Sequence, residues 1–224
     1  MIRVFIGHDP RESGALYVLA SSIQRHSSMP VSITPVALSN LDGIMTRERH
    51  PLQTNDFSFS RFLVPWMCNY EGWAVFMDCD MVARDDIAKL WAWRDERFAV
   101  QCVHHTHVPE EETKYLGQPQ SRYKRKNWSS VVLFNNAKCR ALTPEYVNTA
   151  DGLDLHQFRW LKDEEIGYLP KTWNHLVDYD AHNPGAKLVH YTKGGPYFKS
   201  YRNCDYHQDW NKEKVLMNFI VDES

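Results

Sequence analysis

The chain lacks the sequence signals of several common protein classes. It has no G-x-G-x-x-G segment and no P-loop, so the main support for a dehydrogenase or an ATPase is missing. No apolar run approaches the roughly 18 residues that a membrane span needs, and no charged leader precedes the first apolar segment. The formal net charge is only -2, which gives no general attraction for nucleic acid. We therefore expect a cytoplasmic protein without a transmembrane segment or a nucleic-acid partner.

Disulfide and linker signals are also missing. The five cysteines are odd in number and show no C-x-x-C spacing, which predicts reduced thiols in the core. There is no internal repeat and no linker rich in Gly, Ser or Pro. A chain of 224 residues that is 43% hydrophobic can bury a large core. We expect residues 1–224 to form a single domain.

Apolar strand-like runs alternate with segments of helical spacing along the chain. The expected strands cover residues 3–7, 31–38, 73–77, 98–103, 130–134, 166–169 and 188–191. The expected helices lie around residues 16–23, 59–66 and 144–161, with a last one at about 206–222. This alternation predicts an α/β fold with a mostly parallel central sheet flanked by helices.

The most informative segment is the apolar run from Trp73 to Met77, because it ends in Asp78-Cys79-Asp80. In an extended segment the two carboxylates project to the same side, and ligands bind beyond the carboxyl ends of strands in open α/β sheets. Two carboxylates at such a position can hold Mg²⁺ or Mn²⁺ against a phosphorylated substrate. The alternative, a strand end followed by a helix cap, explains the later pair Asp85 and Asp86 better than it explains this one.

Two other polar clusters carry weaker signals. The basic run 122–126 is typical of a solvated surface loop, with a contact to an anionic acceptor or a membrane surface as the alternative. His104, His105 and His107 precede three glutamates at 110–112 and could form a zinc site. The His-x-His spacing stands in no larger motif, and we favour a mobile loop on the acceptor side of a binding site.

Several segments occur in an order that resembles a known family. They are a polar loop after the first strand, the Phe59–Pro65 segment, the strand with Asp78 and Asp80, and a late His190. This order is similar to the GT-A fold glycosyltransferases, and most nearly to the retaining glycosyltransferase family eight. The resemblance covers residues 4–197 and implies a Rossmann-like, nucleotide-sugar-binding fold.

The resemblance implies a metal site and a donor site. Asp78, Asp80 and His190 would bind Mn²⁺ or Mg²⁺, and Asp78 would also lie beside the donor diphosphate. Arg61 would reach the donor phosphates, since an arginine between two aromatic residues needs an anionic partner. The residues implied in donor binding are Gly7, Asp9, Arg11, Arg61, Asp78, Asn135, Lys193 and Gly194.

The resemblance also implies a catalytic face and an acceptor side. The family carries Asp-Gln-x-x-Leu-Asn near the position of Asp154-Leu155-His156-Gln157, so Gln157 and Asp154 are the candidates for the catalytic face. A surface helix is the alternative explanation of this segment. Asn174 and His175 resemble the residues that frame the acceptor.

The implied activity is transfer of a sugar, most simply from a UDP-hexose, to a hydroxyl group of a glycan or glycolipid with retention of configuration. Such a reaction needs charge stabilisation of the leaving diphosphate more than it needs a strong base. An inverting reaction would need a general base, for which Asp163, Glu164 and Glu165 are available. The alternatives are a metal-dependent phosphohydrolase or nucleotidyltransferase, and a non-catalytic module that binds nucleotide sugars.

Overall fold

The computed structural model describes residues 1–50, 53–106, 113–118 and 123–217. The strands in these residues form two sheets. The strands are β1 (Ile2–Gly7), β2 (Val31–Val36), β3 (Trp73–Met77), β4 (Met81–Ala83), β5 (Val100–Cys102), β6 (Val131–Asn135), β7 (Ile166–Tyr168), β8 (His175–Leu176) and β9 (Leu188–His190). The central sheet has the order β2-β1-β3-β6-β5-β7, and the smaller sheet has the order β4-β9-β8.

The central sheet is mostly parallel, as the sequence predicts. β1 pairs in parallel with β2 and β3, and β5 pairs in parallel with β7. β6 is the exception, because it runs antiparallel to both of its neighbours, β3 and β5. This reversal places the first residue of β6, Val131, beside Met77 at the carboxyl end of β3. The segment that precedes β6 therefore reaches the ligand-binding edge of the sheet.

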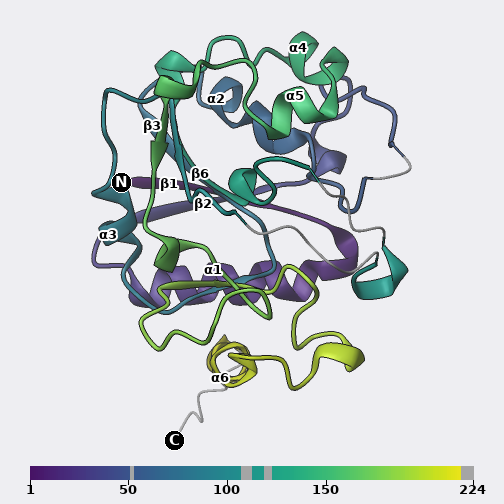
Figure 1. Cartoon of the computed structure of the whole chain (residues 1–224), viewed down its shortest axis with the longest axis vertical. Coiled ribbons are helices and arrows are strands. Elements are labelled where there is room, and N and C mark those ends of the chain that lie inside the picture. Colours follow the sequence, from purple (N-terminus) through teal and green to yellow (C-terminus); the bar gives the residue numbers. More distant parts are fainter. Residues whose placement is uncertain (51–52, 107–112, 119–122, 218–224) are drawn as a thin grey trace, which may run out of the picture.

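Helices cover both faces of the central sheet (Figure 1). The helices are α1 (Ser13–His26), α2 (Val64–Met67), α3 (Ile87–Trp91), α4 (Pro144–Thr149), α5 (Gly152–His156) and α6 (His207–Met217). In Figure 1, α1 lies below the sheet and α2, α4 and α5 lie above it, while α6 lies against the outer side of α1. Arg25 of α1 and Glu213 of α6 form an ion pair across this contact.

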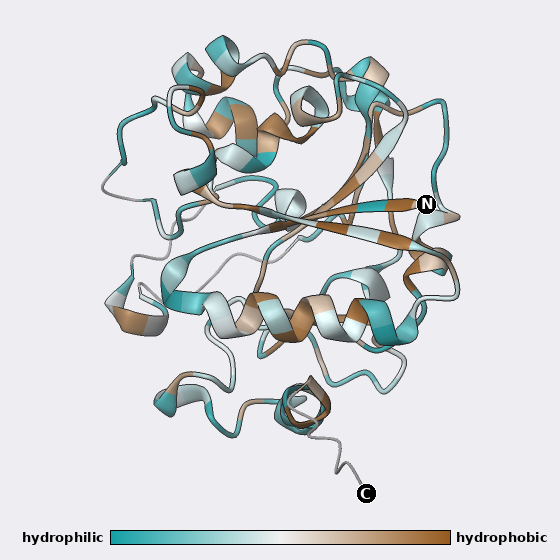
Figure 2. Cartoon of the chain, turned by 180° about the vertical axis from the view of Figure 1, so that it is seen from behind, coloured by the Kyte–Doolittle hydropathy of each residue, from teal (hydrophilic) through white to brown (hydrophobic). Residues whose placement is uncertain are grey.

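The core lies between these layers. β3 and β6 are buried along their whole length, and Figure 2 shows hydrophobic colour along the central strands. Strands that are covered on both faces have continuous apolar sequences, and this is why the positions of these strands could be predicted from the sequence. Cys68, Cys79, Cys102 and Cys139 are buried, as the sequence predicts, whereas Cys204 is only partly buried, and none of the five is in a disulfide. None of the described helices combines the length and the apolar character of a membrane span.

Two of the expected helices differ from the structure. The segment 144–161 forms two short helices, because the backbone at Ala150 is extended (φ -62°, ψ 150°) between α4 and α5. The segment around residues 59–66 forms a short 3₁₀ helix (Ser60–Leu63) followed by α2. The last helix begins at His207, and its expected end near residue 222 lies outside the described residues.

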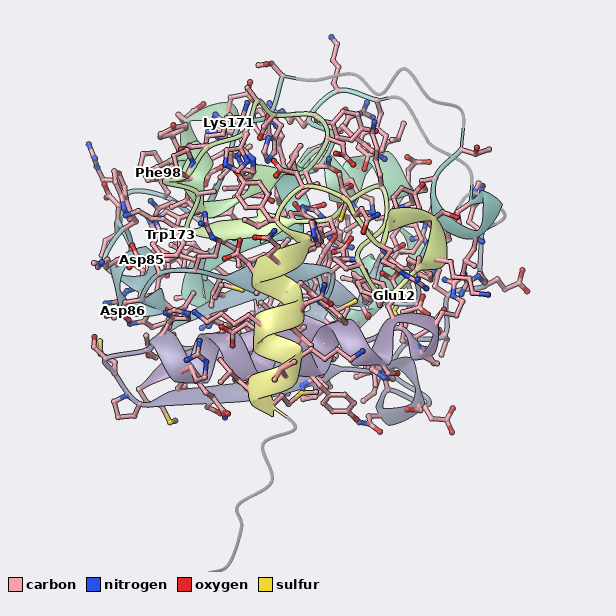
Figure 3. All side chains as sticks on the ribbon, turned by 90° about the horizontal axis from the view of Figure 1, so that it is seen from below. Glu12, Asp85, Asp86, Phe98, Lys171 and Trp173 are labelled. Atoms are coloured by element: carbon pink, nitrogen blue, oxygen red, sulfur yellow. The ribbon has the colours of Figure 1, made fainter. Side chains whose placement is uncertain are left out.

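The acidic pair after β4 serves as a helix cap, as the sequence predicts. The Asp86 side chain accepts a hydrogen bond from the Ala88 N–H at the start of α3 and another from the Ser28 hydroxyl. In Figure 3, Asp85 and Asp86 lie on the opposite side of the view from Glu12, which follows β1. Asp85 and Asp86 are therefore structural and do not join Asp78 and Asp80.

Candidate active site

Asp78, Asp80 and His190 meet where the central sheet passes into the smaller one. Asp78 and Asp80 follow β3, and β4 then pairs antiparallel with β9, opposing Met81 to His190. The Tyr191 N–H donates to the Asp80 carbonyl oxygen over 2.8 Å, which fixes the two segments together. One ligand atom from each of the three side chains lies within 4.8 Å of the others. Residues more than a hundred positions apart thus form a three-ligand cluster.

A chain of hydrogen bonds orients the His190 ring. The Ser130 hydroxyl donates to the Asn127 carbonyl (2.7 Å), so Ser130 Oγ accepts from Asn174 Nδ2 (2.8 Å). Asn174 Oδ1 therefore faces His190 and accepts from Nδ1 over 2.9 Å. His190 Nε2 is left with a lone pair directed at the acidic cluster. Partners of this kind behind a histidine are typical of metal-binding sites.

Two buried atoms of the cluster lack a hydrogen bond among the described residues. His190 Nε2 lies 3.3 Å from Asp80 Oδ1, yet both atoms are unsatisfied. An unsatisfied buried polar atom costs about 1–3 kcal/mol. A cation between the imidazole nitrogen and the carboxylates would satisfy both atoms. Two carboxylates and one imidazole therefore fit a divalent metal ion.

Arg61 holds the Asp78 carboxylate in place. Its Nη1 donates to Asp78 Oδ1 (2.6 Å) and to the Ser129 carbonyl (2.8 Å), and its Nε donates to the Ser58 carbonyl (3.1 Å). Burial raises the pKa of Asp78 to about 6, although the Arg61 charge acts in the opposite direction. Burial also acts to raise the pKa of Asp80, but His190, Lys114 and a backbone hydrogen bond together act in the opposite direction and the net shift is downward.

Metal affinity is expected to fall as the pH drops through about 6. The Asp78 pKa is raised to about 6, so a proton competes with the metal for this carboxylate below that value. Above it Asp78 is ionised, and affinity is expected to level off. The measurement is a Mn²⁺ titration by calorimetry at pH values from about 5 to 8. Affinity that is constant over this range would contradict a role for Asp78 as a ligand.

A cavity of about 440 Å³ opens beside the metal cluster. Its lining combines the acidic cluster with several basic and aromatic side chains. The lining residues outside the cluster include Arg47, His50, Asn55, Ser58, Phe59, Arg61, Lys114, Tyr123, Lys126, Ser129, Asp151, Gly152, Leu153, His156 and Thr192. A concave site with convergent polar groups is the expected form of a small-molecule site.

The catalytic-face candidates Gln157 and Asp154 do not line this cavity. Asp154 forms an ion pair with Arg159 (2.9 Å), and the Gln157 side chain accepts from Arg159 Nε (3.2 Å). In this segment the cavity is lined instead by Asp151, Gly152, Leu153 and His156. The resemblance to the family motif offered these two residues, and the structure places both of them outside the cavity lining.

Asn135 lies at the opposite end of β6 from the cavity. It pairs with Trp73 at the start of β3, and its side chain donates to Glu96. The reversed direction of β6 is the reason, because it brings residues 127–130 to the metal cluster and carries Asn135 away. Ser129 and Ser130, which precede β6, line the cavity in place of Asn135.

The acceptor-side candidates also fall outside the lining. Asn174 supports His190 from behind, as described above. His175 is buried in β8, where its Nε2 lies 3.1 Å from the Tyr206 hydroxyl. Asn174 lies just before β8 and His175 begins it, and the two side chains contact different neighbours.

The first loop supports one wall of the cavity without lining it. The Asp9 carboxylate accepts hydrogen bonds from the Arg11 backbone and side chain, and the Arg11 side chain donates to the Thr54 carbonyl. Gly7 makes room for Phe57, because a Cβ at this position would lie 2.3 Å from ring atoms. These contacts stabilise the segment around Thr54, which does line the cavity.

Lys193 and Gly194 follow His190 of the candidate metal cluster but are not part of the lining. Lys193 Nζ lies 4.4 Å from the centre of the Tyr179 ring. Gly194 has φ +137°, a backbone conformation that disfavours other residues and that lets the chain turn after Thr192. Thr192 is the residue of this segment that reaches the cavity.

The basic run 122–126 is not simply a solvated loop. Tyr123 and Lys126 line the cavity, and Arg125 donates to the Gln157 carbonyl and to Asp163. Burial and the neighbouring Lys114 lower the pKa of Lys126 to about 7. Of the two interpretations of this run, a contact to an anionic acceptor is the one that agrees with a position in the cavity lining. Arg122 lies outside the described residues.

The histidine-rich segment shows no zinc site in its described part. His104 stacks on Trp128 with ring centres 3.9 Å apart, and Trp128 donates to the His105 carbonyl. His107 and residues 110–112 lie outside the described residues. Within the described ranges, Asp78, Asp80 and His190 form the cluster that could hold a metal ion.

Solved structures that resemble this fold are glycosyltransferases. The bifunctional glycosyltransferase WbbM superposes with a TM-score of 0.66 at 14% identity, over 96% of this chain and 49% of that chain. GlyE of Streptococcus pneumoniae gives 0.64 at 14% identity, over 97% and 62%. The galactosyltransferase LgtC, solved with donor and acceptor sugar analogues, gives 0.62 at 13% identity, over 99% and 98%. The chain therefore spans about half of WbbM, and it has the GT-A fold.

Comparison of sequences gives one curated relative of high similarity. No family model matches the chain. Protein CDI of Arabidopsis thaliana is 45% identical over 228 residues, which covers 96% of this chain and 87% of that protein. Identity at this level over nearly the whole length indicates a common structure. The chain belongs to the family of Arabidopsis thaliana Protein CDI, whose members share this GT-A glycosyltransferase fold.

Proposed function

We propose that this protein is a metal-dependent glycosyltransferase that moves a sugar from a nucleoside-diphosphate donor to a hydroxyl group of a glycan or glycolipid. The observation that carries the proposal is the cluster of Asp78, Asp80 and His190 on the wall of a 440 Å³ cavity in a GT-A fold. UDP-hexose is the proposed donor, and Mn²⁺ or Mg²⁺ is the proposed metal. The five unpaired cysteines support a reducing compartment, and we propose the cytoplasm.

The cavity suits a diphosphate that leaves with additional negative charge. Bound between the two aspartates and His190, a divalent ion would neutralise part of that charge. Arg61 positions Asp78, and its Nη2 makes no hydrogen bond that is seen among the described residues. Lys114 and Lys126 also line the cavity, whereas Lys193, expected in donor binding, does not. Preorganised cations of this kind stabilise charge where it develops.

The proposed stereochemistry is retention. In such a step the bond between sugar C1 and the phosphate oxygen breaks, and the acceptor oxygen forms the new bond to C1 on the same face. The leaving diphosphate oxygen takes the hydroxyl proton, so the protein need not supply a strong base. Asp163, Glu164 and Glu165, the bases considered for inversion, are absent from the cavity lining.

A donor screen tests the proposal. The protein is incubated with Mn²⁺ and each common nucleotide sugar, and released nucleotide is measured with and without glycan acceptors. We expect slow release without an acceptor and a large increase when an acceptor hydroxyl is placed at the anomeric carbon. Rapid phosphate release from simple nucleotides would favour a phosphohydrolase. Binding of donor without turnover on any acceptor would favour a non-catalytic module.

A further inference from the structure

Arg47 lies in the wall of the cavity and is held in one orientation. Its Nη1 donates to the carbonyl oxygens of Val147 (3.2 Å) and Ala150 (2.6 Å). The guanidinium carbon lies 4.0 Å from the centre of the Phe59 ring. No hydrogen bond from Nε or Nη2 is seen among the described residues. One edge of the guanidinium group is thus fixed, while two of its nitrogens keep their donors available.

The cavity is open toward this available edge because of Gly152. Gly152 lines the cavity, and a Cβ built on it would lie 3.0 Å from a Phe59 ring carbon and 3.9 Å from Arg47 Nη2. A side chain at this position would therefore cover the ring and the guanidinium edge. Glycine leaves both in reach of a ligand in the cavity. We call Arg47, Phe59, Gly152 and His156 the Arg47 subsite.

The surroundings of the Arg47 subsite carry positive charge. Burial holds the pKa of His156 well below its usual value, and the charges of Arg61, Lys126 and Arg47 add to this effect. Asp151 is the nearest acid, but its Oδ1 caps α5 by accepting from the Leu153 N–H (2.8 Å). Among the described residues no carboxylate forms an ion pair with Arg47 within 4.0 Å. A half-buried guanidinium without a bonded carboxylate is a recognition group for an anion.

We infer that the Arg47 subsite binds the carboxylate of a uronic acid residue, carried by the donor sugar or by the acceptor. The inference rests on the proposed function, and it names the class of sugar that this function uses. The Nε and Nη2 donors of a guanidinium match the two oxygens of a carboxylate. The Phe59 ring beneath the guanidinium offers an apolar face next to it. Arg47 makes no contact with Asp78, Asp80 or His190 among the described residues, and these three are the residues proposed to bind the donor diphosphate through a metal ion.

Binding measurements in the presence of Mn²⁺ test whether the carboxylate belongs to the donor sugar. Dissociation constants are measured for UDP, UDP-glucose and UDP-glucuronate with the wild type and with Arg47→Gln, Arg47→Lys and Arg49→Gln. We expect the wild type to prefer UDP-glucuronate over UDP-glucose by about tenfold or more, a difference of about 1.4 kcal/mol. Arg47→Gln and Arg47→Lys should reduce this ratio to about one, because lysine lacks the planar fork. Arg49→Gln should keep the preference, since Arg49 pairs with Asp56 outside the lining.

A second arm tests the acceptor source. With UDP and Mn²⁺ bound, the proteins are titrated with a uronic acid oligosaccharide and with its carboxyl-reduced form. A preference for the acidic form that requires Arg47 places the carboxylate on the acceptor. Equal binding of acidic and neutral ligands in both arms overturns the inference.

The binding of UDP itself separates the inference from the proposed function. We expect UDP to bind the wild type and Arg47→Gln alike, because Arg47 does not contact the metal cluster. Thermal melts of the Arg47 variants confirm that they fold. Failure of UDP and every other nucleoside diphosphate to bind the wild type would count against the proposed function itself.

Discussion

Asp80→Asn is expected to abolish metal-dependent turnover while the metal-free protein stays as stable as the wild type or becomes more stable. Asp80 Oδ1 and His190 Nε2 face each other 3.3 Å apart without a hydrogen bond. The amide group of an asparagine can donate to that nitrogen, so the variant satisfies both atoms. The cluster then keeps one carboxylate, Asp78, and a divalent ion loses a charged ligand. Stability and metal binding should therefore change in opposite directions.

Thermal melts measure both effects of this substitution. A ligand at about 100 times its dissociation constant adds about 2.7 kcal/mol of stability, which corresponds to a rise in Tm of about 5–10 °C for a chain of this size. Mn²⁺ with a nucleoside diphosphate should raise the Tm of the wild type by this amount and leave Asp80→Asn unchanged. Asp85→Asn is the matched control, because Asp85 pairs with Lys89 away from the cavity. Equal stabilisation of wild type and Asp80→Asn would refute the metal assignment.

His190→Ala and Asn174→Leu are expected to weaken Mn²⁺ binding to different degrees. His190→Ala removes a ligand atom and should have the larger effect. Asn174→Leu keeps the ring but removes the acceptor that holds its Nδ1–H at 2.9 Å. Loss of such a supporting hydrogen bond lowers metal affinity about 10- to 100-fold. Calorimetric titration with Mn²⁺ at neutral pH gives both values.

His175→Ala is the control for the loss of a buried histidine. His175 is buried like His190, but its Nε2 lies beside the Tyr206 hydroxyl. All three substitutions should lower stability, typically by about 1–3 kcal/mol, so stability alone does not separate the roles. His175→Ala should titrate Mn²⁺ like the wild type. If His190→Ala also does so, His190 is only a packed strand residue.

The sequence predicted the two carboxylates of the candidate metal site because their signal is local. The apolar run Trp73–Met77 predicts a buried strand, and Asp78 and Asp80 follow it directly. His190 was predicted as the third member of the cluster from the order of segments that resembles the GT-A glycosyltransferases. The hydrogen-bonded support of that ring by Asn174 and Ser130 could not be predicted, because it joins three separate segments.

The direction of strand β6 and the residues of helix α5 that reach the cavity could not be predicted from residue patterns. A buried strand has the same apolar run in either direction, so nothing in 131–135 shows that β6 is reversed. This reversal decided that Ser129 and Ser130, and not Asn135, reach the cavity. In the same way the packing of α5 places His156, and not Gln157, in the cavity lining.

The sequence by itself determined the α/β class, the buried strands, the reduced cysteines and the paired carboxylates at the end of β3. Each of these depends on the spacing of apolar and charged residues within a short segment, where backbone geometry fixes the side chains. Only the tertiary structure decided which further cations line the cavity beside Arg61. Arg47, Lys114 and Lys126 stand far apart in the chain and resemble ordinary surface residues, and packing alone brings them to one cavity.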